Sequence, residues 1–69
     1  MEKLVAITTS TETVGIKIKD IESIYEDTEG ILSIQTTNSI FHNVIEINGN
    51  HCDDVEEVVF EINETIEGD

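Results

Sequence analysis

Apolar residues recur every three or four positions through the last third of this chain, between residues 53 and 66. At 100° per residue they fall within one sector of about 100°, the width of a core-facing helical stripe. At the start of the stripe, Asp53 and Glu56, or Asp54 and Glu57, have the spacing of a capping box, and acids in a first turn also favour the helix dipole. The sequence therefore predicts a C-terminal amphipathic helix. Its expected core residues are Val55, Val58, Val59, Ile62 and Ile66.

Shorter patterns that are typical of strands precede this helix. Residues 4–7 form an apolar run, residues 14–18 alternate between apolar and polar side chains, and residues 32–36 alternate again before a return strand at 40–47. Turn-forming residues separate the later segments. The expected turns lie at residues 27–30, 37–39 and 48–50.

Residues 20–25 allow two interpretations. Asp20 could cap a single helical turn, or the stretch could form another strand. In either case the patterns predict an α+β fold, in which a small antiparallel sheet of about four strands is packed by the C-terminal amphipathic helix. We expect a single compact domain over residues 1–66 and a flexible acidic tail at residues 67–69.

The length of 69 residues leaves room for only a thin core. Chains this short bury only about 60% of their unfolded surface. The single cysteine, Cys52, excludes an internal disulfide, and no Cys/His spacing suggests a structural metal. We therefore expect a homodimer, in which association supplies additional stability. No apolar segment is long enough for a secretory signal or a membrane span, which predicts a cytoplasmic protein without membrane association.

The sequence carries no motif for catalysis or for binding a cofactor, so we expect a protein that is not an enzyme and uses no cofactor. His42 and His51 have no patterned partner and are expected at the surface. Cys52 is expected to be unreactive, because the two aspartates that follow it favour the neutral thiol. Calcium binding is an alternative, since residues 48–50 and those aspartates supply oxygens within seven residues, although EF-hand spacing is absent.

The charge of the chain is strongly one-sided. Sixteen acids and three bases give a formal net charge of −13, and fourteen acids with no base follow from Asp20 onward. Solubility needs a net charge of only about 2–8, and like charges four residues apart destabilise a helix by about 0.2–0.5 kcal/mol per pair. A compact chain of this length is roughly 28 Å across. Its charge density of about one per 2 Å is close to that of duplex DNA, about one per 1.7 Å. We therefore expect a basic partner.

Acids of the helix and of the turn at residues 27–30 are the candidate contacts for that partner. Phe60 lies among the acids on the helical wheel. It is either a contact in a self-association interface or with a neighbouring loop, or an aromatic anchor within a charged rim. Alternatively, the acids merely keep a small structural or regulatory module soluble, and Phe60 and a strand edge mediate its assembly. The candidate partner-binding residues are Asp53, Asp54, Glu56, Glu57, Glu61, Glu64, Glu26, Asp27, Glu29 and Phe60.

The acid-dense, base-free segment from Asp20 to Asp69 resembles the small acidic DNA-mimic proteins that bacteriophages make to disable host or defence proteins. The resemblance implies an inhibitor that occupies the DNA-binding surface of a basic host protein and does not itself bind nucleic acid. The targets of this class include the histone-like protein HU, restriction enzymes, uracil-DNA glycosylase and RNA polymerase. An acidic dimer suits the two-fold, sequence-indifferent DNA-binding surface of HU, so an HU-like nucleoid-associated protein is the expected target. These proteins share no common motif, and the resemblance assigns no individual site residue.

Overall fold

A computed structural model describes residues 3–68 of the chain. Within this range the strand patterns and the helical pattern of the sequence give seven strands, one short 3-10 turn (η1) and one α-helix. In chain order these are β1 (Leu4–Thr9), β2 (Thr13–Lys17), η1 (Ile18–Asp20), β3 (Ile21–Glu26), β4 (Leu32–Thr36), β5 (Ile40–His42), β6 (Val44–Ile47), β7 (Asn50–His51) and α1 (Val55–Glu67).

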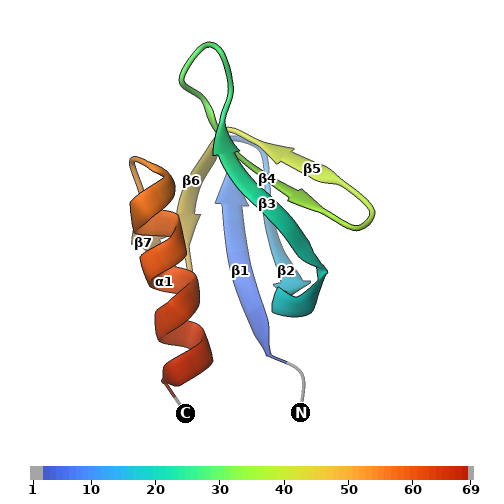
Figure 1. Cartoon of the computed structure of the whole chain (residues 1–69), viewed down its shortest axis with the longest axis vertical. Coiled ribbons are helices and arrows are strands. Elements are labelled where there is room, and N and C mark those ends of the chain that lie inside the picture. The colour runs from blue at the N-terminus through green and yellow to red at the C-terminus, as the bar shows by residue number, and fades with distance from the viewer. Residues whose placement is uncertain (1–2, 69) are drawn as a thin grey trace.

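The strands form two antiparallel sheets, and the fold is α+β, as predicted. One sheet has the order β2-β1-β6-β7, and the other has the order β3-β4-β5 (Figure 1). The strands expected in a single sheet of about four are divided between these two: β1 and β2 lie in the first sheet, and β4 lies in the second. The expected return strand at residues 40–47 contributes β5 to the second sheet and β6 to the first. The chain passes between the sheets at η1 and again at Asn43, where a positive φ of 61° interrupts the expected return strand and separates β5 from β6.

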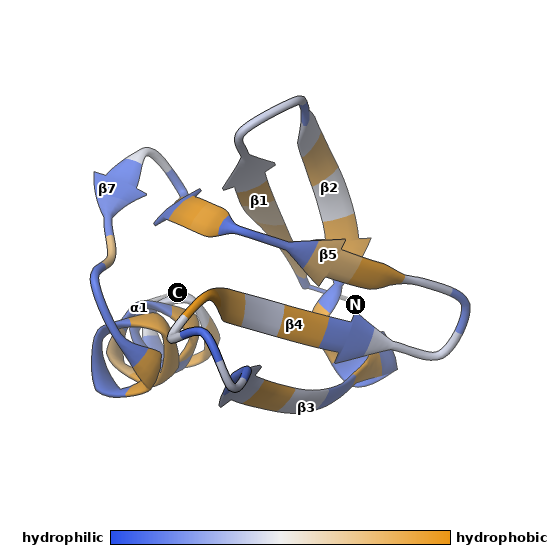
Figure 2. Ribbon diagram, turned by 90° about the horizontal axis from the view of Figure 1, so that it is seen from above, coloured by the Kyte–Doolittle hydropathy of each residue, from blue (hydrophilic) through white to orange (hydrophobic). Residues whose placement is uncertain are grey.

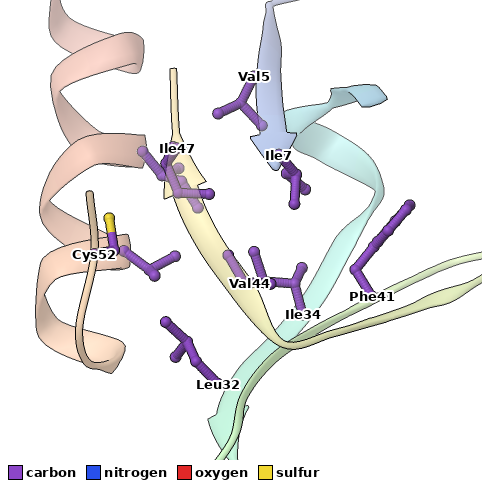
Figure 3. Close-up of a cluster of buried hydrophobic side chains, with 10 residues drawn as sticks. Val5, Ile7, Leu32, Ile34, Phe41, Val44, Ile47 and Cys52 are labelled. Atoms are coloured by element: carbon purple, nitrogen blue, oxygen red, sulfur yellow. The ribbon is translucent and has the colours of Figure 1, made fainter. Parts of the chain in front are cut away.

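The core lies between the two sheets and the helix. Both sheets contribute to it: Ile7 of β1, Ile34 of β4 and Ile47 of β6 are completely buried (Figure 3). Burying an aliphatic side chain of this size contributes about 1.5–3 kcal/mol before conformational entropy is subtracted. The core residues are Val5, Ile7, Leu32, Ile34, Phe41, Val44, Ile47, Cys52, Val58 and Ile62.

Helix α1 covers the open side between the two sheets rather than lying flat on one of them. It packs against β3 of the smaller sheet and β6 of the larger one (Figure 2). This position buries a narrower stripe than the sequence predicts. Val58 and Ile62 are buried and Val55 is half-buried, whereas Val59 and Ile66 are 38% and 46% exposed. The expectation that Val59 and Ile66 belong to the core is therefore wrong, because the helix meets the edges of the sheets along only part of its apolar sector.

The strand interpretation of residues 20–25 is confirmed, and Asp20 does not cap a helical turn within them. Asp20 ends the helical turn η1, and a strand, β3, begins at the next residue. At the other end of the chain, Glu67 completes the last turn of α1 and Gly68 is its C-cap. Of the tail expected at residues 67–69, Glu67 is thus helical, and Asp69 lies outside the described residues.

Candidate functional site

The first turn of α1 is built by the side chains of Asp54 and Glu57. Asp54 is the N-cap, with an extended backbone, and its Oδ1 accepts a hydrogen bond from the backbone N–H of Glu57 at 2.9 Å. The Oε1 of Glu57 reaches back and accepts the backbone N–H of Asp53 at 2.5 Å. The bond to Asp54 satisfies an N–H group that a helix start leaves unpaired, and the bond from Asp53 ties the residue before the N-cap to the first turn. The negative charges also suit the positive end of the helix dipole. Of the two predicted capping pairs, the structure uses Asp54 and Glu57.

Two further acids are held by strand β7. The Nε2 of His51 lies 2.6 Å from Oδ1 of Asp53, and both side chains are largely exposed. The Nδ2 of Asn50 donates to Oε1 of Glu61 at 3.0 Å. The carboxylates of Asp53 and Glu61 are therefore positioned by neighbouring side chains and are also available to a partner. Asn50 and His51 were not predicted to belong to this surface, although their position just before the helix start is the signal that places them there.

Glu56 and Glu64 differ from Glu57 and Glu61, the other candidate partner-binding acids of α1. Both are exposed, and within residues 3–68 their carboxylates have no hydrogen-bond or ion-pair partner. Phe60 lies between them in the sequence, one helical turn from each, and its side chain is 60% exposed. An open depression of about 500 Å³, here called the Phe60 depression, lies at this part of the helix. Its lining residues are His51, Asp54, Glu56, Glu57, Phe60 and Glu61.

The second acid cluster lies in the turn between β3 and β4. Asp27 stabilises this turn, because its Oδ1 accepts the backbone N–H groups of Glu29 at 2.9 Å and of Ile31 at 3.0 Å. Gly30 has a positive φ of 80°, which this turn requires and which glycine adopts without strain. Glu26 and Glu29 are exposed. Asp27 therefore has a structural role, and Glu26 and Glu29 carry the outward charge.

The structure brings the two acid clusters to one end of the molecule. The β3–β4 turn and the start of α1 lie in the same half of the molecule along its long axis (Figure 1). A second hollow is lined by residues of both segments, Gly30 and Asp53. We call residues 26–31 together with residues 53–57 the acidic end. All ten predicted site residues belong to this end or to the exposed side of α1 that continues from it.

The three lysines gather at the opposite end. Lys17 ends β2 and is paired in register with Leu4, next to Lys3, and the backbone N–H of Ile18 donates to the carbonyl oxygen of Lys3 at 3.0 Å. Lys19 lies in η1, the turn that directly follows β2. The long axis measures 36 Å, so the net charge of −13 corresponds to one charge per about 2.8 Å. This mean density is lower than expected and below that of duplex DNA, about one per 1.7 Å. The negative charge is instead concentrated away from the lysines.

Three of the side-chain oxygens considered for calcium have other partners. Oδ1 of Asn48 accepts the backbone N–H of Ala6, and Asp53 and Asp54 bond to His51 and Glu57 as described above. Across residues 3–68, no group of three or more His, Cys, Asp or Glu side chains is arranged to hold a metal ion. The same range contains no helix with the length and apolar character that a bilayer crossing needs.

The remaining reactive side chains have structural surroundings. Cys52 is 3% exposed, and its thiol donates to the carbonyl oxygen of Asn50 at 3.5 Å. Burial raises the pKa of this thiol, and the nearby carboxylates act in the same direction, which keeps it neutral and poorly nucleophilic. His42 is exposed on β5, with its Nδ1 3.4 Å from the hydroxyl oxygen of Ser33.

Comparisons of this chain with protein-family models, with curated proteins and with solved structures found no match. The geometry and charge of the acidic end and of the exposed side of α1 are therefore the basis for proposing a function.

Proposed function

We propose that this protein is a non-enzymatic inhibitor, which acts in the bacterial cytoplasm by occupying the DNA-binding surface of a basic host protein. The observation that carries the proposal is the separation of charge along the molecule. Two acid clusters meet at one end, while the three lysines lie at the other. A negative end of this kind attracts a positively charged groove and orients the approaching molecule.

Different acids contribute to this surface in different ways. The carboxylates of Asp27, Asp54 and Glu57 are held in place by the hydrogen bonds that stabilise the turn and the helix start. Glu26 and Glu56 are exposed and take no part in those bonds. Fixed carboxylates on a rigid scaffold require little ordering when a partner binds, which lowers the entropic cost of association.

An HU-like nucleoid-associated protein is the target that suits this surface best, because its DNA-binding surface is basic and indifferent to sequence. Restriction enzymes, uracil-DNA glycosylase and RNA polymerase are further targets of the same chemistry. We also propose a homodimer that forms through the lysine end, where Leu4 and Ile66 are exposed. Leu4 follows Lys3 in the chain, and the backbone carbonyl oxygen of Ile66 accepts from the Nζ of Lys3. Association there leaves both acidic ends facing outward.

The test compares two variants with the same change in net charge. Glu26→Lys/Glu56→Lys reverses two free carboxylates of the acidic end, and Glu22→Lys/Glu67→Lys reverses two exposed carboxylates elsewhere. Binding to a purified bacterial HU protein is measured by calorimetry at several salt concentrations, with displacement of duplex DNA as a second readout. We expect the first variant to weaken binding at least tenfold and to reduce the salt dependence, and the second to have a much smaller effect.

Equal losses in the two variants would show that only net charge matters and would overturn the assignment of the acidic end. Binding that neither variant changes would overturn the electrostatic mechanism.

The exposure of Phe60 favours a second candidate function, a structural or regulatory interaction module whose acids provide solubility only. The two candidates differ in their response to salt. Apolar contacts persist at high ionic strength, whereas contacts between exposed charges are screened. A partner from the same host that stays bound in 1 M salt would support the module.

A further inference from the structure

Phe60 has no packing role that explains its presence. It lies about 180° around the helix from the midpoint of the buried Val58 and Ile62, at 100° per residue, and its side chain is 60% exposed. Phenylalanine is also a poorer helix former than alanine. The side chain is not one of the residues that form the core or pack against it. Its position therefore favours a contact with another molecule.

The surroundings of Phe60 define the chemistry of that contact. The Phe60 depression combines the ring of Phe60 and the imidazole of His51 with the acidic residues Asp54, Glu56, Glu57 and Glu61. Glu57 is engaged in the helix cap and Glu61 accepts from Asn50, whereas the Glu56 carboxylate has no partner within residues 3–68. An aromatic face beside a free carboxylate matches a cation that can stack and donate hydrogen bonds at the same time.

Arginine fits this arrangement better than lysine. Its guanidinium group is planar, stacks on aromatic faces and carries N–H donors that match a carboxylate in a bidentate geometry. The ammonium group of lysine is a compact, strongly hydrated charge without a planar face. The depression is open to solvent, so an arginine side chain can enter it from a partner surface without rearrangement of the helix.

We infer that the Phe60 depression receives an arginine side chain of the basic partner, with the guanidinium stacked on the ring of Phe60 and hydrogen-bonded to Glu56. This inference rests on the proposed function and specifies its recognition chemistry. Phe60 is the stacking residue, Glu56 is the hydrogen-bond acceptor, and the surrounding carboxylates favour the cation electrostatically.

The first experiment separates stacking from simple apolar contact. Full-length variants Phe60→Ala, Phe60→Leu and Phe60→Trp are compared for binding to a purified bacterial HU protein. We expect about tenfold weaker binding for the alanine and leucine variants, the loss that a desolvated cation–π contact predicts, and unchanged or tighter binding for tryptophan. The matched control is Val59→Ala, because Val59 is an exposed apolar residue on the same helix outside the depression. Wild-type affinity of the leucine variant would overturn the stacking role.

The second experiment does not depend on the target. Proton NMR follows the ring signals of Phe60 while a short arginine-glycine peptide, or a lysine-glycine peptide of equal length and charge, is added. We expect saturable changes in the chemical shifts of the ring, and larger changes with the arginine peptide. Glu56→Gln should weaken binding of the arginine peptide at least threefold. Equal responses to the two peptides, or no response of the ring, would overturn the inference. If the HU protein does not bind but the arginine peptide does, the proposed target fails and the arginine site stands.

Discussion

The Nζ of Lys3 lies 3.3 Å from the carbonyl oxygen of Thr65, and it also contacts the carbonyl oxygen of Ile66. The last turn of α1 contains no basic residue of its own. Lys3 therefore supplies a positive charge to the negative end of the helix dipole from a position 62 residues earlier in the chain. The same contact ties the start of β1 to the end of the helix.

We expect Lys3→Met to lower the free energy of unfolding by about 0.5–1 kcal/mol, the usual contribution of a cation at a helix C-terminus. The effect should decrease with added salt, because the contact is partly exposed. Urea unfolding at low and high salt measures it, and Lys3→Arg is the control that keeps the charge. A methionine variant as stable as the wild type at low salt would contradict this role.

Asn48 joins three parts of the fold. Its Oδ1 accepts the backbone N–H of Ala6 at 2.9 Å, and its Nδ2 donates to the hydroxyl of Thr65 at 2.6 Å. It also adopts a positive φ of 53°, beside Gly49 at 82°, as a tight Asn-Gly hairpin turn requires. One side chain thus connects the β6–β7 turn with β1 and with α1.

Two substitutions separate the roles of Asn48. Asn48→Gly keeps the permitted φ but removes both side-chain hydrogen bonds, and we expect a loss of about 1–2 kcal/mol. Asn48→Ala adds backbone strain of about 1–2 kcal/mol, so it should be the less stable of the two. Chemical unfolding of both proteins gives the order, and Asn38→Ala in the exposed β4–β5 turn is the control. The reverse order would show that backbone strain at this position is unimportant.

Local periodicity was enough to predict the fold class and most elements. The spacing of apolar residues located α1, an apolar run located β1, and alternation located β2 and β4, because these patterns reflect which side chains face the core. The break at Asn43 could not be predicted, since residues 40–47 contain no glycine or proline and read as one strand. A prediction without that break misses the second sheet and the position of α1 between the sheets. It therefore also misses the exposure of Val59 and Ile66.

The candidate site was predictable in composition but not in arrangement. The acids and Phe60 are visible in the sequence, and their common location depends on long-range contacts. The lysines converge because β1 and β2 pair with Leu4 opposite Lys17. The structural roles of Asp27 and Asp54 depend on turn and cap geometry, which composition alone does not distinguish from a surface charge.

The helix cap gives a prediction that also guides charge-reversal experiments. Asp54→Ala should cost about 1 kcal/mol of stability, as for other N-caps. Glu57→Gln should cost less, because the amide oxygen can still accept the N–H of Asp53. Thermal unfolding followed by circular dichroism measures both, with Glu56→Ala as a control that lacks a cap bond. If Glu56→Ala were as damaging as Asp54→Ala, the cap would not be the cause. Charge reversal at Glu57 would change both the stability of the fold and the binding of a partner. Glu56 is therefore the better position for testing binding by charge reversal.

The buried thiol of Cys52 predicts how stability changes at high pH. Burial raises the pKa of this thiol above its ordinary value of 9.0, with the carboxylates of Glu61, Glu57 and Asp53 adding to the effect and a backbone hydrogen bond at Ile47 opposing it. The unfolded chain therefore loses the thiol proton at a lower pH than the folded protein. Above that pH the unfolded state binds fewer protons, so the free energy of unfolding falls as pH rises.

Cys52→Ala removes this titration. We expect the alanine variant to be less stable than the wild type at pH 7, because it leaves a small cavity in the core. The difference between the two proteins should shrink between pH 9 and pH 10.5, since only the wild type loses stability through the thiol. Urea unfolding of both proteins at pH 7, 9 and 10.5 measures this difference in the free energy of unfolding. The contribution of the other titratable groups is the same in both proteins and drops out of the difference. A difference that stays constant over this range would contradict a raised thiol pKa in the folded protein.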